Sequence, residues 1–462
     1  MAQFSKIDID LLKRYDVPGP RYTSYPTAPA FSKSFGPDDY RKAIIINNSG
    51  DNKSDLSLYL HIPFCNTLCY FCGCNMLVTH NPQKIEGYLN ALKKEICMVQ
   101  SLLKKERKVS QLHFGGGTPS YLNPCQIQGL MEFLHHMFKF TFDSEISVEI
   151  DPRGLTFEHM KAFRKNGFNR VSMGIQDFDP VVQKATNRIQ PENLTKKAID
   201  WSKELEFKSI NVDLIYGLPL QKPESFEKTL DKIIQLSPER IAVFNFAYVP
   251  WLKAHQRVIR KEDLPSPKLK LQILKMTIEK LSNAGYVYIG MDHFAKPDDE
   301  LAIAQKEKTL YRNFQGYSTK SGADLYAFGV SAISQFHNIY AQNTKAFKDY
   351  LNKIDKGDMA IAIGYRMNND DIIRRHVIMR LMCDMEITKS EVEEAFGVNF
   401  EEYFASSMLK LKTFLEDGLL EIKKDKIAVK GVGRLVIRNI AMSFDAYIDK
   451  LMEEKPVFSR TV

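Results

Sequence analysis

Short strands alternate with helices through the first half of this 462-residue chain, and this alternation restricts the fold more than any other feature. Strands that alternate with helices form parallel sheets with right-handed crossovers. The chain is therefore expected to be an α/β protein. Its six strand–helix units are fewer than the eight that close a barrel. Six runs have strand character: 56–63, 109–117, 144–151, 168–176, 209–217 and 240–248.

Helical signals occupy the intervals between these strands. Residues 81–103 open with Asn-Pro, which is typical of an N-cap and a first turn, and continue with apolar residues at helical spacing. Cys97 lies on this helix, and we expect it to pack in the core. Ser266-Pro267 starts another helix, which is expected to stop at Gly285.

The two ends of the chain lack the strand–helix alternation of the central part. Residues 1–55 form an N-terminal arm with a short helical pattern and then the irregular stretch GPRYTSYPTAP, in which Arg21, Tyr22 and Tyr25 are unusual for a linker. Residues 56–365 are expected to be the catalytic domain, a partial barrel with an extension. Residues 366–462 are expected to be a smaller, mostly helical domain.

The C-terminal domain has a winged-helix-like pattern. The stretch GLLEIKKDKIAVKG predicts a two-stranded wing, and a last helix is expected over roughly 431–450. Because its lysines are few and no basic recognition helix is evident, we expect packing against the barrel rather than DNA binding.

Bulk composition excludes several classes of protein. At 44% hydrophobic and 26% charged residues the chain resembles an ordinary enzyme, and its net charge of +8 is too dispersed to indicate nucleic acid. No apolar run of 18 residues and no signal sequence is seen, so no membrane association is expected. Seven cysteines, an odd number, point to a reducing compartment, and a cytoplasmic location is expected.

Four cysteines lie within ten residues in CNTLCYFCGCN: Cys65, Cys69, Cys72 and Cys74. No second CxxC or HxxxH pair follows to close a zinc site, and ferredoxin runs supply four ligands rather than three. Three thiolates on one loop would leave one iron of a [4Fe–4S] cluster open to a small molecule. The alternative is a chance group of buried free cysteines.

Polar and glycine residues at the strand ends mark a second group of candidates, because ligands of parallel α/β proteins bind at the carboxyl ends of strands. Each is weak alone: the glycines suit any tight turn, and the acids and the arginine suit any surface. His61, His113 and His293 lack a second ligand at metal-site spacing. The candidates are Tyr59, His61, Gly115 to Gly117, Thr118, Glu149, Gln176, Asp213, Ala247 and Arg188.

The cysteine spacing CxxxCxFC resembles the signature of the radical S-adenosylmethionine (SAM) enzymes. The longer string LYLHIPFCNTLCYFCGCN resembles the oxygen-independent coproporphyrinogen III oxidase family, as do MDHFAKPDDEL, NFQGY and IRNIAMSFDAY further along. This resemblance implies a partial (β/α)6 radical-SAM barrel with an arm near the active site.

The same resemblance implies the cofactors and their residues. A [4Fe–4S] cluster would be held by Cys65, Cys69 and Cys72, and two SAM molecules would bind, one on the cluster and one beside it. In relatives, Phe71 contacts the adenine through its backbone. The positions that match SAM-contacting positions of the family are Tyr59, Phe71, Gly116, Gly117, Thr118, Glu149, Gln176, Arg188, Asp213, Ala247 and Ile333, with Tyr59 and His61 near the reaction.

The reaction that the resemblance implies is oxidative decarboxylation in haem biosynthesis. A 5′-deoxyadenosyl radical abstracts hydrogen from the β-carbon of a propionate, and loss of CO₂ and one electron leaves a vinyl group. Two rounds convert coproporphyrinogen III to protoporphyrinogen IX. Arginines should hold the spare propionates, with Arg21 and Arg460 as candidates. A low-potential donor such as flavodoxin or ferredoxin and a monomeric state are expected.

Two alternatives stay open at this point. A haem-binding chaperone shares the radical-SAM core, but it is typically shorter and lacks both the arm and the fourth cysteine of CGC. Another radical-SAM enzyme that acts on porphyrins, such as a ring-opening methyltransferase, would differ only in its products. The role of Cys74 is ambiguous, because ligation of the fourth iron by Cys74 would exclude SAM from it.

Overall fold

All six predicted strands of the alternating part are present in the computed structural model, which describes residues 7–49, 52–454 and 458–461. They pair in parallel in chain order, as predicted. Their bounds are β1 Leu56–Ile62, β4 Lys108–Gly116, β5 Lys139–Ile150, β6 Arg170–Gln176, β7 Ser209–Tyr216 and β8 Arg240–Asn245. Because β8 ends at Asn245, Ala247 lies two residues beyond the strand and not at its end as predicted.

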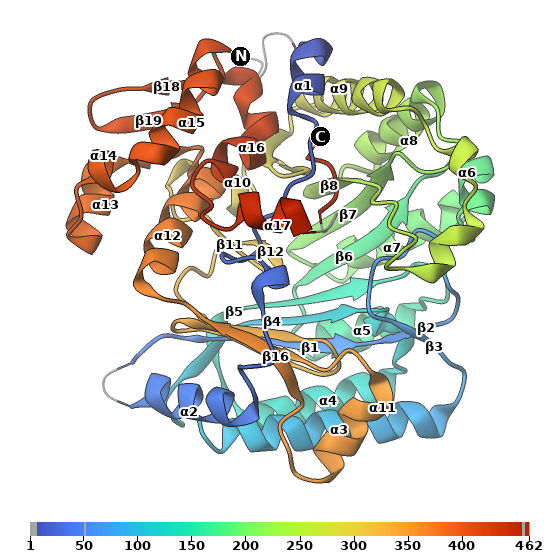
Figure 1. Ribbon diagram of the computed structural model, residues 1–462. Coiled ribbons are helices and arrows are strands. Elements are labelled where there is room, and N and C mark those ends of the chain that lie inside the picture. The colour runs from blue at the N-terminus through green and yellow to red at the C-terminus, as the bar shows by residue number, and fades with distance from the viewer. Residues whose placement is uncertain (1–6, 50–51, 455–457, 462) are drawn as a thin grey trace.

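Alternating side chains give the sheet an apolar outer face and a polar inner face. Along β7, Val212 and Leu214 are fully buried under the outer helices, whereas Asn211 and Asp213 are half-buried and line an interior cavity. The outer face is covered as Figure 1 shows. The covering helices include α3 Pro82–Gln100, α4 Pro124–Met137, α5 Phe157–Lys165, α7 Glu192–Glu204, α8 Pro223–Leu236 and α9 Pro267–Asn283.

The two predicted helix starts are confirmed by their N-caps, and the first of these helices ends at Gln100, three residues before the predicted end. The Asn81 side chain accepts the Lys84 N–H, and the Ser266 side chain accepts the Leu269 N–H. The core position expected for Cys97 is wrong, because Cys97 is exposed. It follows buried Ile96 by one residue, which turns its side chain about 100° away from the apolar stripe.

Six further strands widen the sheet beyond the predicted six. The added strands are β13 Asp324–Phe328, β14 Ile333–Phe336, β15 Ile339–Asn343, β16 Ile361–Arg366, β9 Val287–Gly290 and β10 His293–Ala295. The sheet runs β16-β15-β14-β13-β1-β4-β5-β6-β7-β8-β10-β9, so it curves around an interior without closing. β13 pairs in parallel with β1, and the outer added strands pair antiparallel. These strands are short, and most of them follow one another without a helix between them, so they gave no regular strand–helix alternation to detect.

The C-terminal elements pack against one side of the sheet, as predicted. They begin with α12 Asn369–Asp384, which contacts α10 Glu300–Lys306 and β11 Tyr311–Asn313. Arg380 donates to the carbonyls of Lys308 and Leu310 across this contact. The predicted wing is present as β18 Leu420–Ile422 and β19 Lys426–Val429, and a third strand, β17 Glu386–Thr388, joins it. Between these strands lie α13 Lys389–Phe396, α14 Phe400–Tyr403 and α15 Ala405–Glu416.

The single helix predicted over 431–450 is wrong. The segment divides into the 3₁₀-helix η5 Gly431–Val436, α16 Ile437–Met442 and α17 Ile448–Glu454. The N-terminal arm causes the interruption, because the Ala446 N–H donates to the Tyr25 hydroxyl and Tyr22 donates to the Asp445 carboxylate. A continuous helix would use the Ala446 N–H internally.

The arm crosses the front of the molecule from α1 Ile9–Tyr15 to α2 Pro37–Asn48, in dark blue in Figure 1. Arg438 of α16 fixes both chain ends: its buried guanidinium donates to the carbonyls of Gly19, Pro20, Arg460 and Thr461. Within the described residues, no helix is long and apolar enough to cross a membrane. The division at residues 55 and 365 stays a prediction.

Candidate active site

The cysteine loop leaves the carboxyl end of β1 and lies against the glycine run that ends β4. The loop is pinned at its base by two short strands, β2 Phe64–Cys65 and β3 Leu77–Val78. The Gly117 N–H donates to the Ile62 carbonyl at 2.9 Å, and the Leu77 N–H donates to the Pro63 carbonyl at 2.7 Å. The sequence therefore places the cysteines at the strand end where ligands of parallel sheets bind.

The thiols of the loop have different polar neighbours. The sulfur of Cys69 accepts hydrogen bonds from Arg153 at 3.4 Å and from Arg188 at 3.6 Å. The Sγ of Cys65 lies 3.4 Å from the Thr118 hydroxyl, and burial raises the pKa of this thiol to about 11. A hydrogen bond from the Cys74 thiol lowers the pKa of Cys72. Cys72 is thus the better thiolate of that pair.

The three sulfurs do not converge on one point. Over the ranges that the structure describes, no group of three or more His, Cys, Asp or Glu side chains could hold a single metal ion. In an iron–sulfur cube each thiolate binds a different iron, so its ligands stand apart around the cluster.

A segment around 253–256 holds the backbone of the cysteine loop from outside. Lys253 donates to the Cys74 carbonyl at 3.0 Å, and the His255 ring is 2.7 Å from the Cys72 carbonyl. The Gln256 side chain donates to two carbonyls, those of Phe71 at 3.2 Å and Ala247 at 3.1 Å. Two predicted cofactor positions are therefore joined through one buried glutamine.

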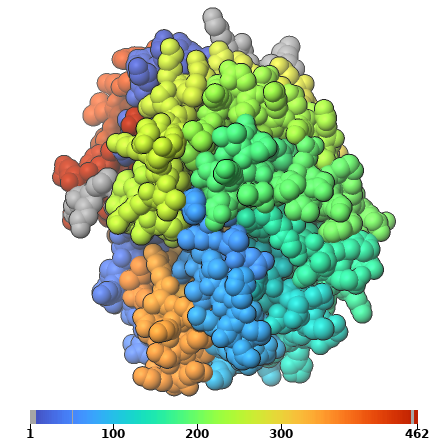
Figure 2. Space-filling view, turned by 90° about the vertical axis from the view of Figure 1, so that its right-hand side faces the viewer, coloured from blue at the N-terminus to red at the C-terminus, as the bar shows by residue number. Residues whose placement is uncertain are grey.

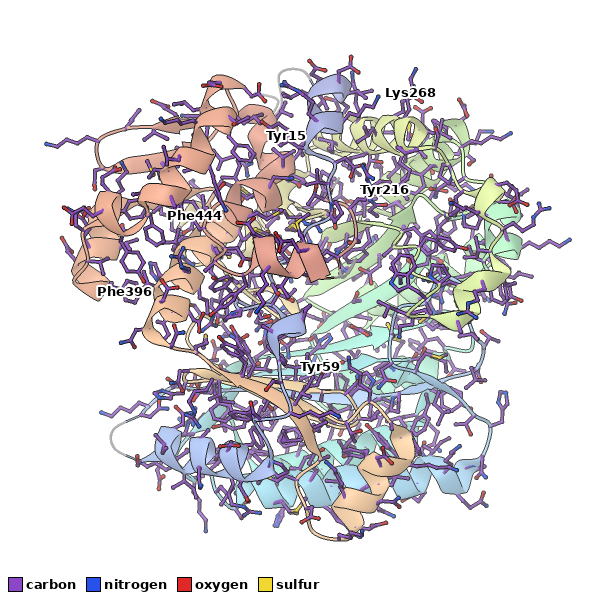
Figure 3. All side chains as sticks on the ribbon, viewed as in Figure 1. Tyr15, Tyr59, Tyr216, Lys268, Phe396 and Phe444 are labelled. Carbon is purple, nitrogen blue, oxygen red and sulfur yellow. The ribbon has the colours of Figure 1, made fainter. Side chains whose placement is uncertain are left out.

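Inside the barrel, Tyr59 and His61 of β1 lie beside polar residues of β4 and β5. The Tyr59 hydroxyl is 3.0 Å from His61 Nδ1, and the Tyr59 ring stacks on His113 at 5.8 Å. Burial lowers the pKa of His61, whose Nε2 lies 2.8 Å from the Asn75 carbonyl. Figure 3 shows Tyr59 near the middle of the molecule.

Glu149 of β5 connects this group to the glycine run. Its carboxylate accepts the Gly116 N–H at 3.1 Å and lies 3.3 Å from His113 Nε2. Burial would raise its pKa, but the hydrogen bond and charge of His113 hold it below the usual range. Its side chain keeps 43% of its surface accessible, and this surface faces two cavities, so the carboxylate can meet a ligand.

The glycines of β4 are required by close packing. A Cβ on Gly117 would lie 2.6 Å from the Pro63 carbonyl, at the start of the cysteine loop. A Cβ on Gly116 would lie 2.6 Å from the His61 ring, and its φ of 117° is also costly for other residues. Only glycine lets the strand end approach the loop this closely.

Gln176 and Arg188 have buried polar atoms without partners. Arg188 donates to the Gly174 carbonyl at 2.6 Å and pairs with Asp151 at 3.1 Å, but its Nε has no hydrogen-bond partner among the described residues. The same holds for Oε1 of Gln176, which ends β6 with a φ of 69°. Unpaired buried polar atoms are rare, and these two are available for a ligand.

Cavities lie on both sides of Glu149. One, of about 250 Å³, is lined by Tyr59, His61 and Ile333 among others. A second, of about 200 Å³, is lined by Asp213, whose pKa is raised to about 6 by burial and by the charge of Glu149. A third, of about 350 Å³, opens beside Cys65 and Thr118.

Comparison with known proteins gives the family. Residues 59–233 match the Radical SAM superfamily, and residues 367–436 match the HemN C-terminal domain. The oxygen-independent coproporphyrinogen III oxidase of Escherichia coli (strain K12) is 47% identical over 441 residues, which are 96% of this chain and 95% of that protein. The oxidase of Pseudomonas aeruginosa is 47% identical over 98% of both chains. This chain belongs to the oxygen-independent coproporphyrinogen III oxidase family.

The fold of this family member agrees with the same relatives. The solved structure of E. coli coproporphyrinogen III oxidase (HemN), described as a radical SAM enzyme, superposes with a TM-score of 0.91 at 47% identity and covers 96% of this chain and all of that one. The radical SAM family implies a [4Fe–4S] cluster and SAM. The cysteine loop, the glycine cradle and the unpaired Gln176 and Arg188 atoms fit both.

Several contacts of this coproporphyrinogen oxidase family member were missed from sequence. Arg153 follows the third strand by three residues, and a wider search of strand ends would have found it. His255 and Gln256 lie in a stretch without a motif, so no sequence signal marks them. Of the two arginines predicted to hold propionates, Arg460 pairs with Asp16 and Arg21 pairs with Asp292 at 3.1 Å.

Proposed function

We propose that this chain decarboxylates two propionate side chains of coproporphyrinogen III to vinyl groups, which gives protoporphyrinogen IX in haem biosynthesis. The observation that carries the proposal is the cavity that opens beside Cys65 and Thr118 at the carboxyl ends of the strands, in a chain 47% identical to named oxidases. The named relatives favour this reaction over the haem chaperone and over ring-opening methyl transfer.

The cluster and SAM, when bound, supply the one-electron chemistry that removes hydrogen from the propionate β-carbon. The chain's own contribution is to hold these groups and the substrate in the correct relative orientation and to exclude water. Cys65, Cys69 and Cys72 are proposed as the three cluster ligands. Cys74 is then a hydrogen-bonding neighbour of Cys72.

Two SAM sites are proposed from the two groups of candidate residues. Tyr59, Glu149 and Ile333 line one interior cavity, and we assign them to the SAM on the cluster. Asp213 lines the second cavity, and Gln176 and Arg188 each keep an unpaired buried polar atom, so we assign these three residues to the second molecule. The remaining assigned positions, Phe71, Gly116, Gly117, Thr118 and Ala247, surround the loop itself.

Arg312 is the best candidate for binding a substrate carboxylate. Its side chain is 3% exposed, its guanidinium stands 4.7 Å over the Tyr317 ring on the cavity wall, and Nη1 has no hydrogen-bond partner among the described residues. No carboxylate within the described ranges pairs with it, and its other donors reach only the Arg21 carbonyl. A buried arginine without a counter-ion is suited to an anionic ligand.

Further features of the reaction follow from the family resemblance. A low-potential carrier such as flavodoxin or ferredoxin is proposed as the electron donor, and the active species is proposed to be a monomer. All seven cysteines are free, which supports a reducing compartment, and we propose the cytoplasm.

The test is anaerobic turnover by the reconstituted protein with SAM, a low-potential reductant and coproporphyrinogen III. Chromatography should show 5′-deoxyadenosine together with a divinyl porphyrin product. Deoxyadenosine without vinyl products would contradict the proposed substrate. Stoichiometric haem binding without either product would support the chaperone instead.

A further inference from the structure

We propose that residues 250–261, the outer wall of the cysteine loop, form the docking face for an acidic one-electron carrier protein. This inference rests on the proposed function, because the proposed chemistry needs a donor that reduces the cluster before SAM is cleaved. One electron would pass from the carrier to the cluster, so the carrier is oxidised by one electron and the cluster reduced by one. We call residues 250–261 the docking segment.

The docking segment is in direct contact with the cysteine loop. Lys253, His255 and Gln256 each bind a backbone carbonyl of the loop, at 3.0, 2.7 and 3.2 Å. A protein bound to the outer side of the segment is therefore separated from the loop by a single layer of chain. Tyr59 and Glu149, by contrast, face the interior cavity, so a carrier can approach without entering the substrate's space.

Large apolar side chains are exposed on the segment. Trp251 is 56% exposed, Leu252 66% and Val258 59%. Ile189, 65% exposed, belongs to the neighbouring loop, in which Asn187 donates to the Leu68 carbonyl. Single exposed apolar residues are ordinary, but a group of them beside a functional site is typical of a protein-binding surface.

Cationic side chains surround these apolar residues. Lys253, Arg257 and Lys261 form no ion pair with any residue that the structure describes, and Arg257 and Lys261 are exposed. Arg260 is the exception, because it pairs with Asp263 at 2.8 Å. A cationic rim attracts an acidic protein and accelerates its association.

The charge argues against a second copy of this chain as the occupant. Two copies of the docking segment would bring like charges together, which disfavours a symmetric dimer through this face. In Figure 2 the blue part of the chain reaches the surface below yellow-green segments, with an orange part, the colour of α11 (Phe347–Asp355), to its left.

The experiment compares two charge reversals of equal size in the reconstituted holoprotein. The test variant is Arg257→Glu with Lys261→Glu. The control is Lys105→Glu with Lys108→Glu, two exposed lysines at the opposite, amino-terminal end of the parallel strands. A purified bacterial flavodoxin is the probe. Its affinity in the oxidised state is measured by calorimetry, and its rate of cluster reduction in the reduced state by anaerobic stopped flow.

We expect the test variant to lose about tenfold in flavodoxin affinity and in reduction rate at low salt, since steering by charge has at least this size. Reduction by dithionite should be unchanged, and the control should behave as wild type. Equal losses in both variants would overturn the proposal, as would slower reduction by dithionite, which would indicate damage to the cysteine loop. A dimer in sedimentation that Trp251→Ser with Leu252→Ser makes monomeric would assign the face to a second copy.

These outcomes are separate from failure of the proposed function. Flavodoxin binding and cluster reduction are measured without porphyrin, so they can succeed even if the substrate is different. Conversely, a protein that decarboxylates with dithionite but shows no binding of flavodoxin at the docking segment would contradict this inference alone.

Discussion

At the scale of single residues, the site depends on which polar groups are already paired within the protein. The Cys69 sulfur receives two guanidinium donors, whereas Cys72 and Cys74 share a hydrogen bond. Arg188 and Gln176 keep one buried polar atom each without a partner among the described residues. The paired groups build the loop, and the unpaired ones are available to a ligand.

The cysteines give the first prediction. Cys74→Ser should keep its iron and sulfide, because Cys74 is exposed and acts on Cys72 by hydrogen bonding. Cys65→Ser, Cys69→Ser and Cys72→Ser should each lose the cluster. Iron and sulfide analysis after anaerobic reconstitution measures this. Loss of the cluster in Cys74→Ser would contradict the three-ligand assignment.

Asp213 predicts that SAM binding depends on pH. Its pKa is raised to about 6, so it is ionised above that pH and neutral below it. Only the ionised form attracts the sulfonium of SAM. Affinity for the second SAM should therefore fall about fourfold between about pH 7.5 and about pH 5.5, where about a quarter of the carboxyl is ionised.

Asp213→Asn provides the control for this titration. The amide keeps the shape and can still accept the Ser172 hydroxyl, but it cannot titrate. Equilibrium dialysis with labelled SAM should show weaker binding without the fall toward acid pH. An unchanged pH dependence in Asp213→Asn would assign the titration to another group.

At the scale of elements, the end of β4 and the start of the cysteine loop are fitted to each other. The Gly117 N–H bonds the last residue of β1, and a side chain at Gly117 would collide with the Pro63 backbone. The loop cannot retreat freely, because the docking segment holds it from the other side. The end of β4 and the docking segment thus hold the cysteine loop in place from two sides.

Gly117→Ala tests the close fit between the end of β4 and the cysteine loop. We expect the reconstituted variant to hold little cluster and to be less stable by about 2 kcal/mol, since overpacking against backbone forces the chain to shift. Gly129→Ala is the matched control, because nothing lies within 4 Å of its added Cβ on α4. That variant should be as stable as wild type or gain up to about 1 kcal/mol. Normal cluster content in Gly117→Ala would contradict the fit.

At the scale of the whole molecule, the two chain ends close one side of the barrel together. Arg438 binds four carbonyls from both ends, and burial lowers its pKa to about 10. The arm then brings Arg21 to Asp292, next to the Phe244 ring on the cavity wall. Closure of the cavity therefore depends on a contact between residues more than 400 positions apart.

Arg438→Ala should destabilise the protein by about 3 kcal/mol or more, because four carbonyls lose their donor at a buried position. Arg366→Ala is the control: Arg366 is exposed and stands over the Phe35 ring, so its loss should cost no more than about 0.5 kcal/mol. Urea unfolding of both variants measures the difference. Equal stability of the two variants would contradict the closing role.

Sequence reasoning reached the parallel core and the cysteine loop because both are local patterns. Six strands from 56 to 248 and the caps at Asn81 and Ser266 were predicted and are present. The division of the last helix was not predictable, because it depends on Tyr22 and Tyr25 from the other end of the chain. His255 and Gln256 were missed for the same reason: their partners lie about 180 residues away.

The most direct measurement of the central claim follows the hydrogen atom. Coproporphyrinogen III deuterated at the propionate β-carbons is turned over anaerobically with SAM and a reductant, and the 5′-deoxyadenosine is analysed by mass spectrometry. The account predicts deoxyadenosine that carries deuterium, formed together with the vinyl product. Deoxyadenosine without deuterium, alongside unchanged propionates, would contradict it.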